Sequence, residues 1–600
     1  MCGIFGLHLN RPLTEDDIAL GRAGAEALSY RGPDDAGEWF DREAGVYFGH
    51  RRLSIIDLSP GGRQPMVRDD HALTCNGEIY NFRPIGRALR QAGIGLSTQS
   101  DSEVLLQALR HWGEAALDRL DGMFAFAYWD GTRTTLAVDP FGEKPLYYAI
   151  TDDGLYFASE LRPLARLLKL EVAIDDENWA AFLSLGYIPG PQTIYPAVRR
   201  LEPASVMRVA GGAAQTPRRY WSMPVGQAGR GAPQPLSEND LDRLCASLIG
   251  SLEGRLVADV PIGLFLSAGI DSSLIAALCR QELGRSLECL TVAFPAGDVV
   301  DECAAAAAVA AYLDLPHRVL ENRTDPESAG IARVVDLFGQ PSGNSAILPV
   351  DQLCATATRH YKVGLTGLGG DEMTWGYGKN QTYWRWRRVF GLPGPVRQAA
   401  GLVGRIVGGR AARFGNRIGA ATTEIYLANK NFPALPWLKA LPGFDSWSKR
   451  AFDDPSPMEF AVPLFDANQV MPNMQLPAFD HASMRHGLEL RTPFLNRDVA
   501  ETVAQFDPRA LLAFGQKGVL RRLLGRYLPE ELFDRPKTGF TFPDEFIVGN
   551  APAPGPVRGL PQSAIDTVWR HRTEPGGWRL LALRLLSAAH FFHSERVEQG

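Results

Sequence analysis

Cysteine is scarce in this sequence and never paired at metal-site spacing. The seven cysteines stand at positions 2, 75, 245, 279, 289, 303 and 354, and no Cys-x-x-Cys occurs. An odd, scattered set argues against a disulfide framework and against a structural zinc site. The cysteine pattern therefore favours a reducing, cytoplasmic location.

Long apolar runs and an excess of positive charge are also missing. No stretch approaches the ~20 uncharged apolar residues of a membrane helix. The opening residues MCGIFGLHLNRP lack a secretory signal's basic region and long apolar run. The net charge of −6 argues against a basic nucleic-acid-binding domain as the main function. We therefore expect neither a membrane nor a nucleic acid as partner.

The length and composition favour more than one folded domain. The chain has 600 residues, of which 45% are hydrophobic and 22% charged, and it contains no internal repeat. At roughly 100–200 residues per domain, two or more domains with sizeable cores are expected.

The first 200 residues have the pattern of short strands with few helices. Ser100 and Glu103 predict a capping box at the start of an amphipathic helix over Val104–Trp112. The pattern suits antiparallel sheets covered by helices. The expected strands are Gly3–Leu9, Val46–His50, Leu53–Leu58, Phe124–Trp129, Leu136–Asp139, Leu146–Ile150 and Leu155–Ser159.

The chain changes character after a linker. In residues 206–237, glycine and proline interrupt every hydrophobic pattern, which predicts a linker. This linker separates a predicted domain at 2–205 from a second at 238–600. Strands and helices then alternate, which predicts a doubly wound parallel sheet with ligands beyond the strand ends. Beyond 380 the pattern is mainly helical, and the basic segment Tyr383–Gly419 is expected to be a helical insertion with a solvated face. The expected strands are Pro261–Leu266, Leu287–Phe294, His317–Leu320 and Lys362–Thr366, and the expected helices Ile270–Leu283 and Asp301–Leu313.

Cys2 follows the initiator methionine directly. Removal of Met1 would give Cys2 a free α-amine, whose pKa near ~7.7–8.0 makes it a plausible proton acceptor for the thiol at neutral pH. One residue then supplies both nucleophile and base. The alternative is a small buried hydrophobic residue.

Five motifs place Cys2 in a wider pattern. Arg31 and Arg52 lie in YRGPD and HRRLS, Asn76 in CNGEIYN and Asp101 in SDSE, all after the opening MCGIFG. The series resembles the glutaminase domain of class II glutamine amidotransferases, which implies an αββα N-terminal-nucleophile hydrolase sandwich.

The resemblance assigns roles to these residues. Cys2 would attack the glutamine side-chain amide, and Asn76 and Gly77 would form the oxyanion hole. The glutamine substrate would be bound by Arg52, Asn76, Gly77, Glu78 and Asp101. Arg52 would bind its α-carboxylate and Asp101 its ammonium group. Singly, each has a structural alternative: a turn for Asn76-Gly77, a helix-dipole partner for Asp101 and an ion pair for Arg52.

A serine-rich turn follows the strand Pro261–Leu266. Ser267, Ser272 and Ser273 supply hydroxyl donors at a helix start, where phosphate binds well, and Asp271 suits Mg²⁺. The alternative is a helix N-terminus with serine caps.

The wider context resembles the asparagine synthetase branch of the ATP pyrophosphatases. The turn resembles SGGxDS with Ala268 in place of a glycine, and GLGGDE resembles the G-x-G-x-D-E turn whose Asp371 would be the second magnesium ligand. Asp480–Met484 and Glu489–Asn496 match the synthetase C-terminal helices, and Lys537 would balance charge on the adenylate. An exposed loop lysine is the alternative for Lys537. The ATP-binding residues implied are Leu266, Ser267, Ala268, Gly269, Asp271, Ser272, Ser273, Val292, Thr366 and Gly367.

The resemblance implies a glutamine-hydrolysing asparagine synthetase that uses ATP and Mg²⁺. Ammonia from glutamine would attack an acyl-adenylate, giving asparagine, glutamate, AMP and pyrophosphate; a homodimer is also implied. Leu368 stands where many synthetases carry an acid, and Met373–Gly378 departs from the usual continuation. Two alternatives therefore stay open: an amide ligase for another carboxylate, such as a sugar acid, peptide or natural-product precursor, and a non-synthetase with a decayed ATP half.

Overall fold

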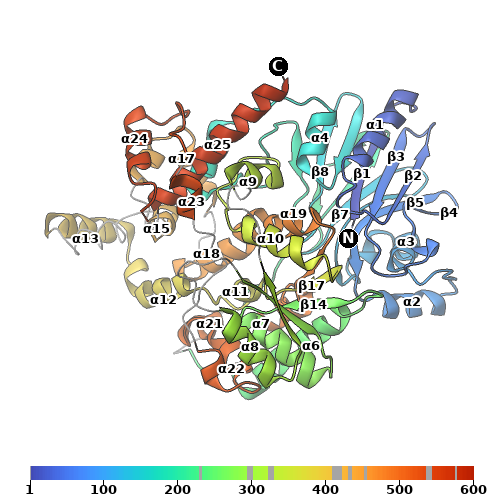
Figure 1. Ribbon diagram of the computed structural model, residues 1–600. Helices are drawn as coiled ribbons and strands as arrows, with labels where there is room; N and C mark the ends of the chain where they lie inside the picture. The colour runs from blue at the N-terminus through green and yellow to red at the C-terminus, as the bar shows by residue number, and fades with distance from the viewer. Residues whose placement is uncertain are drawn as a thin grey trace.

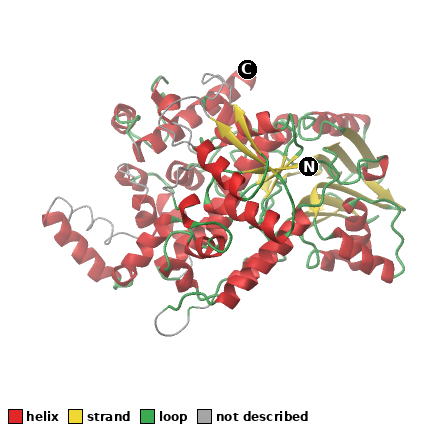
Figure 2. Cartoon of the chain, turned by 60° about the horizontal axis from the view of Figure 1, so that its bottom comes forward, coloured by secondary structure: helices red, strands yellow, loops and turns green. Residues whose placement is uncertain are grey.

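The computed structural model describes residues 2–226, 228, 233–293, 302–321, 330–407, 422–429, 435–451, 456–534, 544–549, 551–574 and 577–599. Figure 1 shows two sheets at one side of the molecule and a third sheet among helices. Figure 2 shows the strands gathered toward one side and helices over the rest.

Two antiparallel sheets form the N-terminal half, residues 2–219. The first has the order β10 (Val198–Arg200), β8 (Tyr147–Thr151), β9 (Gly154–Ala158), β1 (Cys2–Leu9), β3 (Val46–Arg52) and β2 (Asp35–Asp41). The second has the order β12 (Ala213–Ala214), β11 (Ser205–Ala210), β7 (Thr134–Val138), β6 (Gly122–Trp129), β5 (His71–Ile79) and β4 (Met66–Arg68), with β13 (Arg218–Arg219) also on β11.

The two sheets and the helices on their outer faces form four layers, because the side chains along each strand alternate between the two faces of its sheet. Ile4, Phe48 and Trp129 point between the sheets and share one core, whereas Phe5 and Phe126 point outward. Helices α1 (Glu15–Glu26), α4 (Leu161–Leu167) and α5 (Asp176–Leu185) cover the first sheet, and α2 (Phe82–Gln91) and α3 (Asp101–Trp112) cover the second. The expected αββα sandwich is confirmed.

Several local predictions for this half are wrong. Leu53–Leu58 is a loop, because its apolar residues pack under α2 and α3 instead of pairing with a strand. Ser100 caps α3 through the Ser102 amide, but Glu103 turns back to the Ser97 amide, so no capping box forms. The sequence did not predict β2, β4, β5, β10 or β11–β13. Strands β12 and β13 and all of β11 except Ser205 lie in the predicted linker.

A five-stranded parallel sheet organises the C-terminal half, residues 233–599. Its order is β16 (His317–Glu321), β15 (Glu288–Ala293), β14 (Ile262–Phe265), β17 (Val363–Leu365) and β18 (Glu489–Arg491). One face packs on α6 (Glu238–Arg255), α7 (Ile270–Ala277), α8 (Glu302–Tyr312), α20 (Arg497–Val503) and α22 (Gly518–Leu524), and the other on α9 (Ile331–Phe338), α10 (Ile347–Ala357) and α19 (Leu476–Met484). The doubly wound fold is confirmed. The resemblance placed Glu489–Asn496 in a helix, whereas residues 489–491 form the fifth strand.

The remaining described helices surround this sheet. Arg584, on α25 (Gly577–Gln599), donates to the carbonyl oxygens of Leu183 (2.7 Å) and Ser184 (2.9 Å) at the end of α5, so the end of the chain is tied to the N-terminal half. No helix in the described part of the chain is long and apolar enough to cross a membrane. The other helices are α11 (Gly370–Met373), α12 (Gly378–Phe390), α13 (Gly394–Val407), α15 (Thr422–Asn429), α16 (Leu435–Lys439), α17 (Phe444–Ala451), α18 (Met458–Phe465), α21 (Pro508–Ala513), α23 (Asp544–Gly549) and α24 (Gln562–Arg570); a π-helix, Asp466–Gln475, joins α18 to α19.

Candidate active site

Cys2 lies at the open edge between the two antiparallel sheets. It has the same parity on β1 as Ile4, so its side chain faces the second sheet, and it pairs directly with Arg52 of β3. The residue is 5% exposed, and this burial raises the pKa of the thiol. A buried thiol needs a local base before it can act as a thiolate nucleophile.

Asn76 and Gly77 lie opposite Cys2, inside strand β5. The Cys2 amide donates to Asn76 Oδ1 at 2.9 Å, and Asn76 Nδ2 is buried without an acceptor among the described residues. A Cβ at Gly77 would lie 2.2 Å from the Met123 carbonyl oxygen, so only glycine fits. The turn alternative is wrong for this pair, because both residues pair with β6. An unsatisfied buried donor beside a nucleophile is suited to an oxyanion.

Arg52 reaches around the loop that follows its strand. Its Nη2 donates to the carbonyl oxygens of Ile56 (3.1 Å) and Asp57 (2.5 Å). A Cβ at Gly62 would lie 1.9 Å from that nitrogen, so Gly62 leaves the room that the guanidinium occupies. The loop therefore fixes Arg52 beside Cys2 through neutral carbonyls, which leave its positive charge uncompensated.

Two buried carboxyl groups complete this cluster. Asp101 Oδ2 accepts from the Ile79 amide at 2.9 Å, while Glu78 Oε2 has no partner among the described residues. Burial raises the pKa of both groups, and the charge of Asp101 raises that of Glu78 further. We call Cys2, Arg52, Asn76, Gly77, Glu78 and Asp101 the thiol site; the fold brings all six predicted residues to one end of the sandwich.

Arg31 is a further residue at the thiol site, for which the sequence motif assigned no role. Its Nε donates to the Cys2 carbonyl oxygen at 3.1 Å, and its two Nη atoms pair with Glu160 (2.7 Å) and Asp480 (2.8 Å). Lys144 also reaches Asp480, at 3.3 Å. Since Asp480 belongs to α19, a buried ionic network ties the backbone of Cys2 to the C-terminal half. The YRGPD motif was the available signal.

The second predicted site lies at the point where the strand order of the parallel sheet reverses. The strand order changes between β14 and β17, and both glycine-rich turns leave the carboxyl ends of these neighbouring strands. A Cβ at Gly367 would lie 2.8 Å from Asp271 Cβ, so the two turns touch. This crevice is where open α/β sheets bind their ligands.

Hydroxyl groups and strained backbone shape the first turn. Ser272 Oγ accepts from the Ser267 amide at 3.3 Å and donates to the Gly269 carbonyl at 3.2 Å. Ala268, at the position of the family's glycine, has φ +53°, a left-handed conformation that costs an L-residue roughly 1–2 kcal/mol. The other predicted ATP-binding residues stand beside this turn: Leu266 after β14, Val292 in β15, Thr366 after β17, and Ser273 in α7.

Asp271 and Asp371 converge on one lysine. Lys517 Nζ lies 3.2 Å from Asp371 Oδ2 and also contacts Asp271 Oδ2, and these two carboxylates raise the pKa of the lysine despite its burial. Two carboxylates that share one cation fit Mg²⁺, which prefers oxygen ligands and octahedral geometry completed by phosphate and water. We call Ser267–Ser273, Asp371 and Lys517 the acid site. Lys537, the predicted cation, lies outside the described residues; no role was predicted for Lys517 from the sequence.

Charged and aromatic side chains fill the space between the two sites. The Tyr80 ring lies 4.5 Å from the Arg255 guanidinium and 5.5 Å from that of Arg491. Arg491 donates to Glu489 at 2.6 Å, and Glu489 in turn raises the pKa of Glu78 in the thiol site. The Arg491 carbonyl accepts from the Thr366 amide (3.0 Å), which carries this connection to the acid site.

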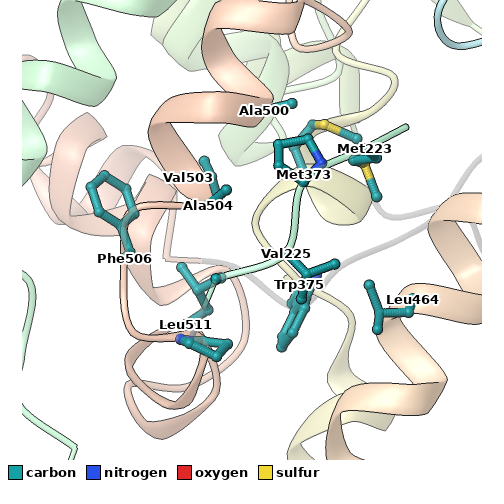
Figure 3. Close-up of a pocket in the computed structure, with 13 residues that line it drawn as sticks. Met223, Val225, Met373, Trp375, Leu464, Ala500, Val503, Ala504, Phe506 and Leu511 are labelled. Carbon is teal, nitrogen blue, oxygen red and sulfur yellow. The ribbon is translucent and has the colours of Figure 1, made fainter. Parts of the chain in front are cut away.

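An apolar pocket lies behind the second glycine-rich turn (Figure 3). Trp375 and Met373 line it from the turn, facing Leu464 of α18 and Val503 of α20. Trp375 is buried, with φ +56°, and its ring lies 5.9 Å from that of Phe460. The sequence departure at 373–378 therefore places an aromatic side chain in the wall of this apolar pocket.

Known families match this chain in two separate regions. Residues 1–221 match the family described as glutamine amidotransferase domain, and residues 243–550 match asparagine synthase. A putative glutamine-hydrolyzing asparagine synthetase of Mycobacterium bovis is 33% identical over 88% of this chain and 86% of its own length. Glutamine-hydrolyzing asparagine synthetase 1 of Bacillus subtilis is 29% identical over 90% and 87%, and amidase chry2 of Gibberella zeae 25% identical over 92% and 90%. The chain belongs to the glutamine-hydrolysing asparagine synthetase family and is a ligase of that type.

Proposed function

We propose that this enzyme hydrolyses glutamine at the thiol site and uses the ammonia to amidate a carboxylate at the acid site. The carboxylate would attack the α-phosphate of ATP, forming an acyl-adenylate and releasing pyrophosphate. Ammonia would then displace AMP from the acyl carbon. The observation that supports this most is the presence, in one chain, of an unsatisfied oxyanion donor beside Cys2 and a pair of acids at a phosphate-binding crevice.

Glutamine hydrolysis follows from the geometry of the thiol site. With Met1 removed, the Cys2 α-amine would take the thiol proton, and the thiolate would attack the side-chain amide. The tetrahedral oxygen would accept from Asn76 Nδ2 and the Gly77 amide, two donors that need no rearrangement. Arg52 would hold the substrate α-carboxylate and Asp101 its ammonium, with Glu78 at hand as a second buried acid. The tetrahedral intermediate would collapse with cleavage of the C–N bond, and the Cys2 α-amine would return its proton to the departing ammonia. Water would then hydrolyse the thioester to glutamate and restore the thiol.

Activation of the acceptor carboxylate follows from the acid site. Asp271 and Asp371 would hold Mg²⁺, which would neutralise charge on the pyrophosphate. Ser267, Ser272 and the amides of the turn would bind the phosphates, and Lys517 would balance the charge that develops on the departing group. Lys537 stays a second candidate for that role.

Ammonia must cross from one site to the other without being protonated. The buried contacts of Arg31 with Asp480, and of Tyr80 with Arg255, join the two halves around the space between the sites. Such an interior favours the uncharged form of ammonia over ammonium, since burial disfavours charge. We therefore place its path along this interface.

Aspartate is the proposed acceptor, and the product asparagine. The alternative is another carboxylate, such as a sugar acid, peptide or natural-product precursor. Two departures from the family pattern favour this alternative: Leu368 stands where many synthetases carry an acid, and Met373–Gly378 differs from the usual continuation. A decayed ATP half is disfavoured, since Asp271 and Asp371 still share a cation.

A substrate panel tests the proposal. Pyrophosphate and AMP release are measured with ATP, Mg²⁺ and glutamine, with aspartate present or absent, and then with other carboxylates. Aspartate-dependent release supports the asparagine synthetase proposal. Release with another carboxylate alone supports the alternative, and release with none of them contradicts both.

A further inference from the structure

Helix α13 carries an apolar stripe that faces solvent. Val396, Ala399, Ala400, Val403 and Ile406 recur at intervals of three and four residues, which places them on one face. Val396 is 49% exposed, Val403 59% and Ile406 78%. A stripe of this kind normally packs against a core, yet here it is open to water.

The exposure is concentrated in this insertion. Six of the thirteen exposed large hydrophobic side chains in the described part of the chain lie between residues 386 and 406: Trp386, Leu392, Val396, Leu402, Val403 and Ile406. In Figure 1 α13 stands at the edge of the molecule, and the view of Figure 2 shows the same end projecting from the body. Clustered exposed apolar side chains mark an interaction surface.

The same segment is positively charged throughout. Residues 378–407 contain no aspartate or glutamate, although the chain carries 68 acidic residues. Arg385 and Arg388 are exposed on α12, and Arg387 stacks on Trp384 at 3.8 Å. Lys379 pairs with the buried Asp466 at 2.7 Å. The cations of the segment are Lys379, Arg385, Arg387, Arg388, Arg397 and Arg405.

We propose that α12 and α13 form an interfacial anchor that binds the surface of an anionic lipid bilayer. The apolar stripe would enter the headgroup boundary, while the arginines would bind the lipid phosphates. Trp386, exposed on α12, has the amphipathic ring that favours this boundary. The anchor lies on the surface, so the absence of a membrane-crossing helix from the described residues is compatible with it.

Two other partners fit the segment less well. Nucleic acid would use the cations and leave the apolar stripe in water. A second copy of this chain would bring two acid-free cationic surfaces together, and their repulsion would oppose the contact. An anionic bilayer satisfies both the stripe and the charge.

Vesicle flotation with the full chain tests the anchor. The protein is mixed with vesicles of phosphatidylcholine alone or with phosphatidylglycerol added, at low and high salt. Binding is expected only to the anionic vesicles. Val403→Asp with Ile406→Asp should lower it by at least about tenfold, and Arg385→Gln or Arg388→Gln by roughly fivefold each.

Ile150→Asp is the matched control, because Ile150 is 52% exposed but lies on β8, outside the insertion. It should bind vesicles as the parent does. Glutamine hydrolysis in every variant reports that the protein is folded. No binding to anionic vesicles would overturn the anchor, as would equal binding by the α13 variants. Concentration-dependent self-association that is lost in the α13 variants, with no vesicle binding, would show instead that the stripe joins two copies.

Discussion

The thiol site and the acid site reach their geometry by different means. The thiol site is built from strands β1, β3 and β5 of the sandwich and from the start of α3. Its polar groups are buried with too few partners: Asn76 Nδ2 and Glu78 Oε2 have none among the described residues. The acid site is built from segments far apart in sequence: Lys517 and Asp271 are 246 positions apart. Its energetic cost is backbone strain. Ala268, Trp375 and Lys517 all have left-handed φ values between +53° and +56°. Desolvation therefore prepares the first site and conformational strain the second.

The sharpest separation of the two sites is expected from Cys2→Ala. Glutamine-dependent amidation should fall by at least about a thousandfold, because the nucleophile is lost. Ammonia-dependent amidation should persist, since the acid site is intact. The measurement is product formed with glutamine or with ammonium at high pH. Loss of both activities would mean that Cys2 is not confined to supplying ammonia.

The converse experiment removes charge from the acid site. Asp271→Asn, Asp371→Asn and Lys517→Met should each lower pyrophosphate release by about a hundredfold or more, while glutamate release continues. Lys537→Met is the matched comparison for the lysine. If Lys537→Met abolishes pyrophosphate release and Lys517→Met does not, the assignment of the cation to Lys517 is wrong.

A third prediction concerns the network that joins the halves. Arg31→Met removes the arginine that Asp480 and Glu160 share and leaves these buried carboxylates with longer contacts only, Lys144 at 3.3 Å and His481 at 3.7 Å, so it should destabilise the protein by roughly 3–5 kcal/mol. The measurement is urea unfolding followed by tryptophan fluorescence and by glutamine hydrolysis. Arg22→Met, which removes an exposed pair with Glu38, should change stability little. Equal effects of the two variants would show that the Arg31 network does not hold the halves together.

The smallest expected effect tests the strain at the acid site. Ala268→Gly removes the left-handed penalty but adds freedom to the unfolded chain, so a net stabilisation of about 0.5–1 kcal/mol is expected. Thermal unfolding with and without ATP measures it. Ala276→Gly, within α7, is the control and should destabilise. A lower melting temperature for Ala268→Gly would show that the residue is not strained.

Hydrophobic periodicity, together with glycine, proline and other turn residues, predicted most of the architecture. Four strands of the parallel sheet were predictable because each is a short run with apolar residues in a region where strands and helices alternate. The fifth, β18, was not, because its sequence is ELR. Strands β2 and β5 were not, because their sequences DAGEWFD and HALTCNGEI mix polar and small residues. In β5, Asn76, Gly77 and Glu78 belong to the thiol site, and these residues interrupt the apolar pattern by which a strand is predicted.

The site residues divide in the same way. Cys2, Asn76 and Asp101 were predictable because each lies in a short motif. Lys517 was assigned no role, since a lysine near a glycine has no local feature that marks a cation between two carboxylates. Arg31 had a motif but no visible partner, because Asp480 lies 449 positions away.

By itself, the sequence determined the identities and the order of the chemical groups: a cysteine at position 2, an oxyanion pair, a serine-rich turn and two acids. These are encoded locally, in a few adjacent residues each. Only the tertiary structure decided which groups meet, because contacts such as Arg31 with Asp480 and Lys517 with Asp271 depend on how distant elements pack. The same packing leaves the apolar stripe of α13 in water, which its periodicity alone does not reveal, since a stripe that is buried and a stripe that is exposed have the same sequence.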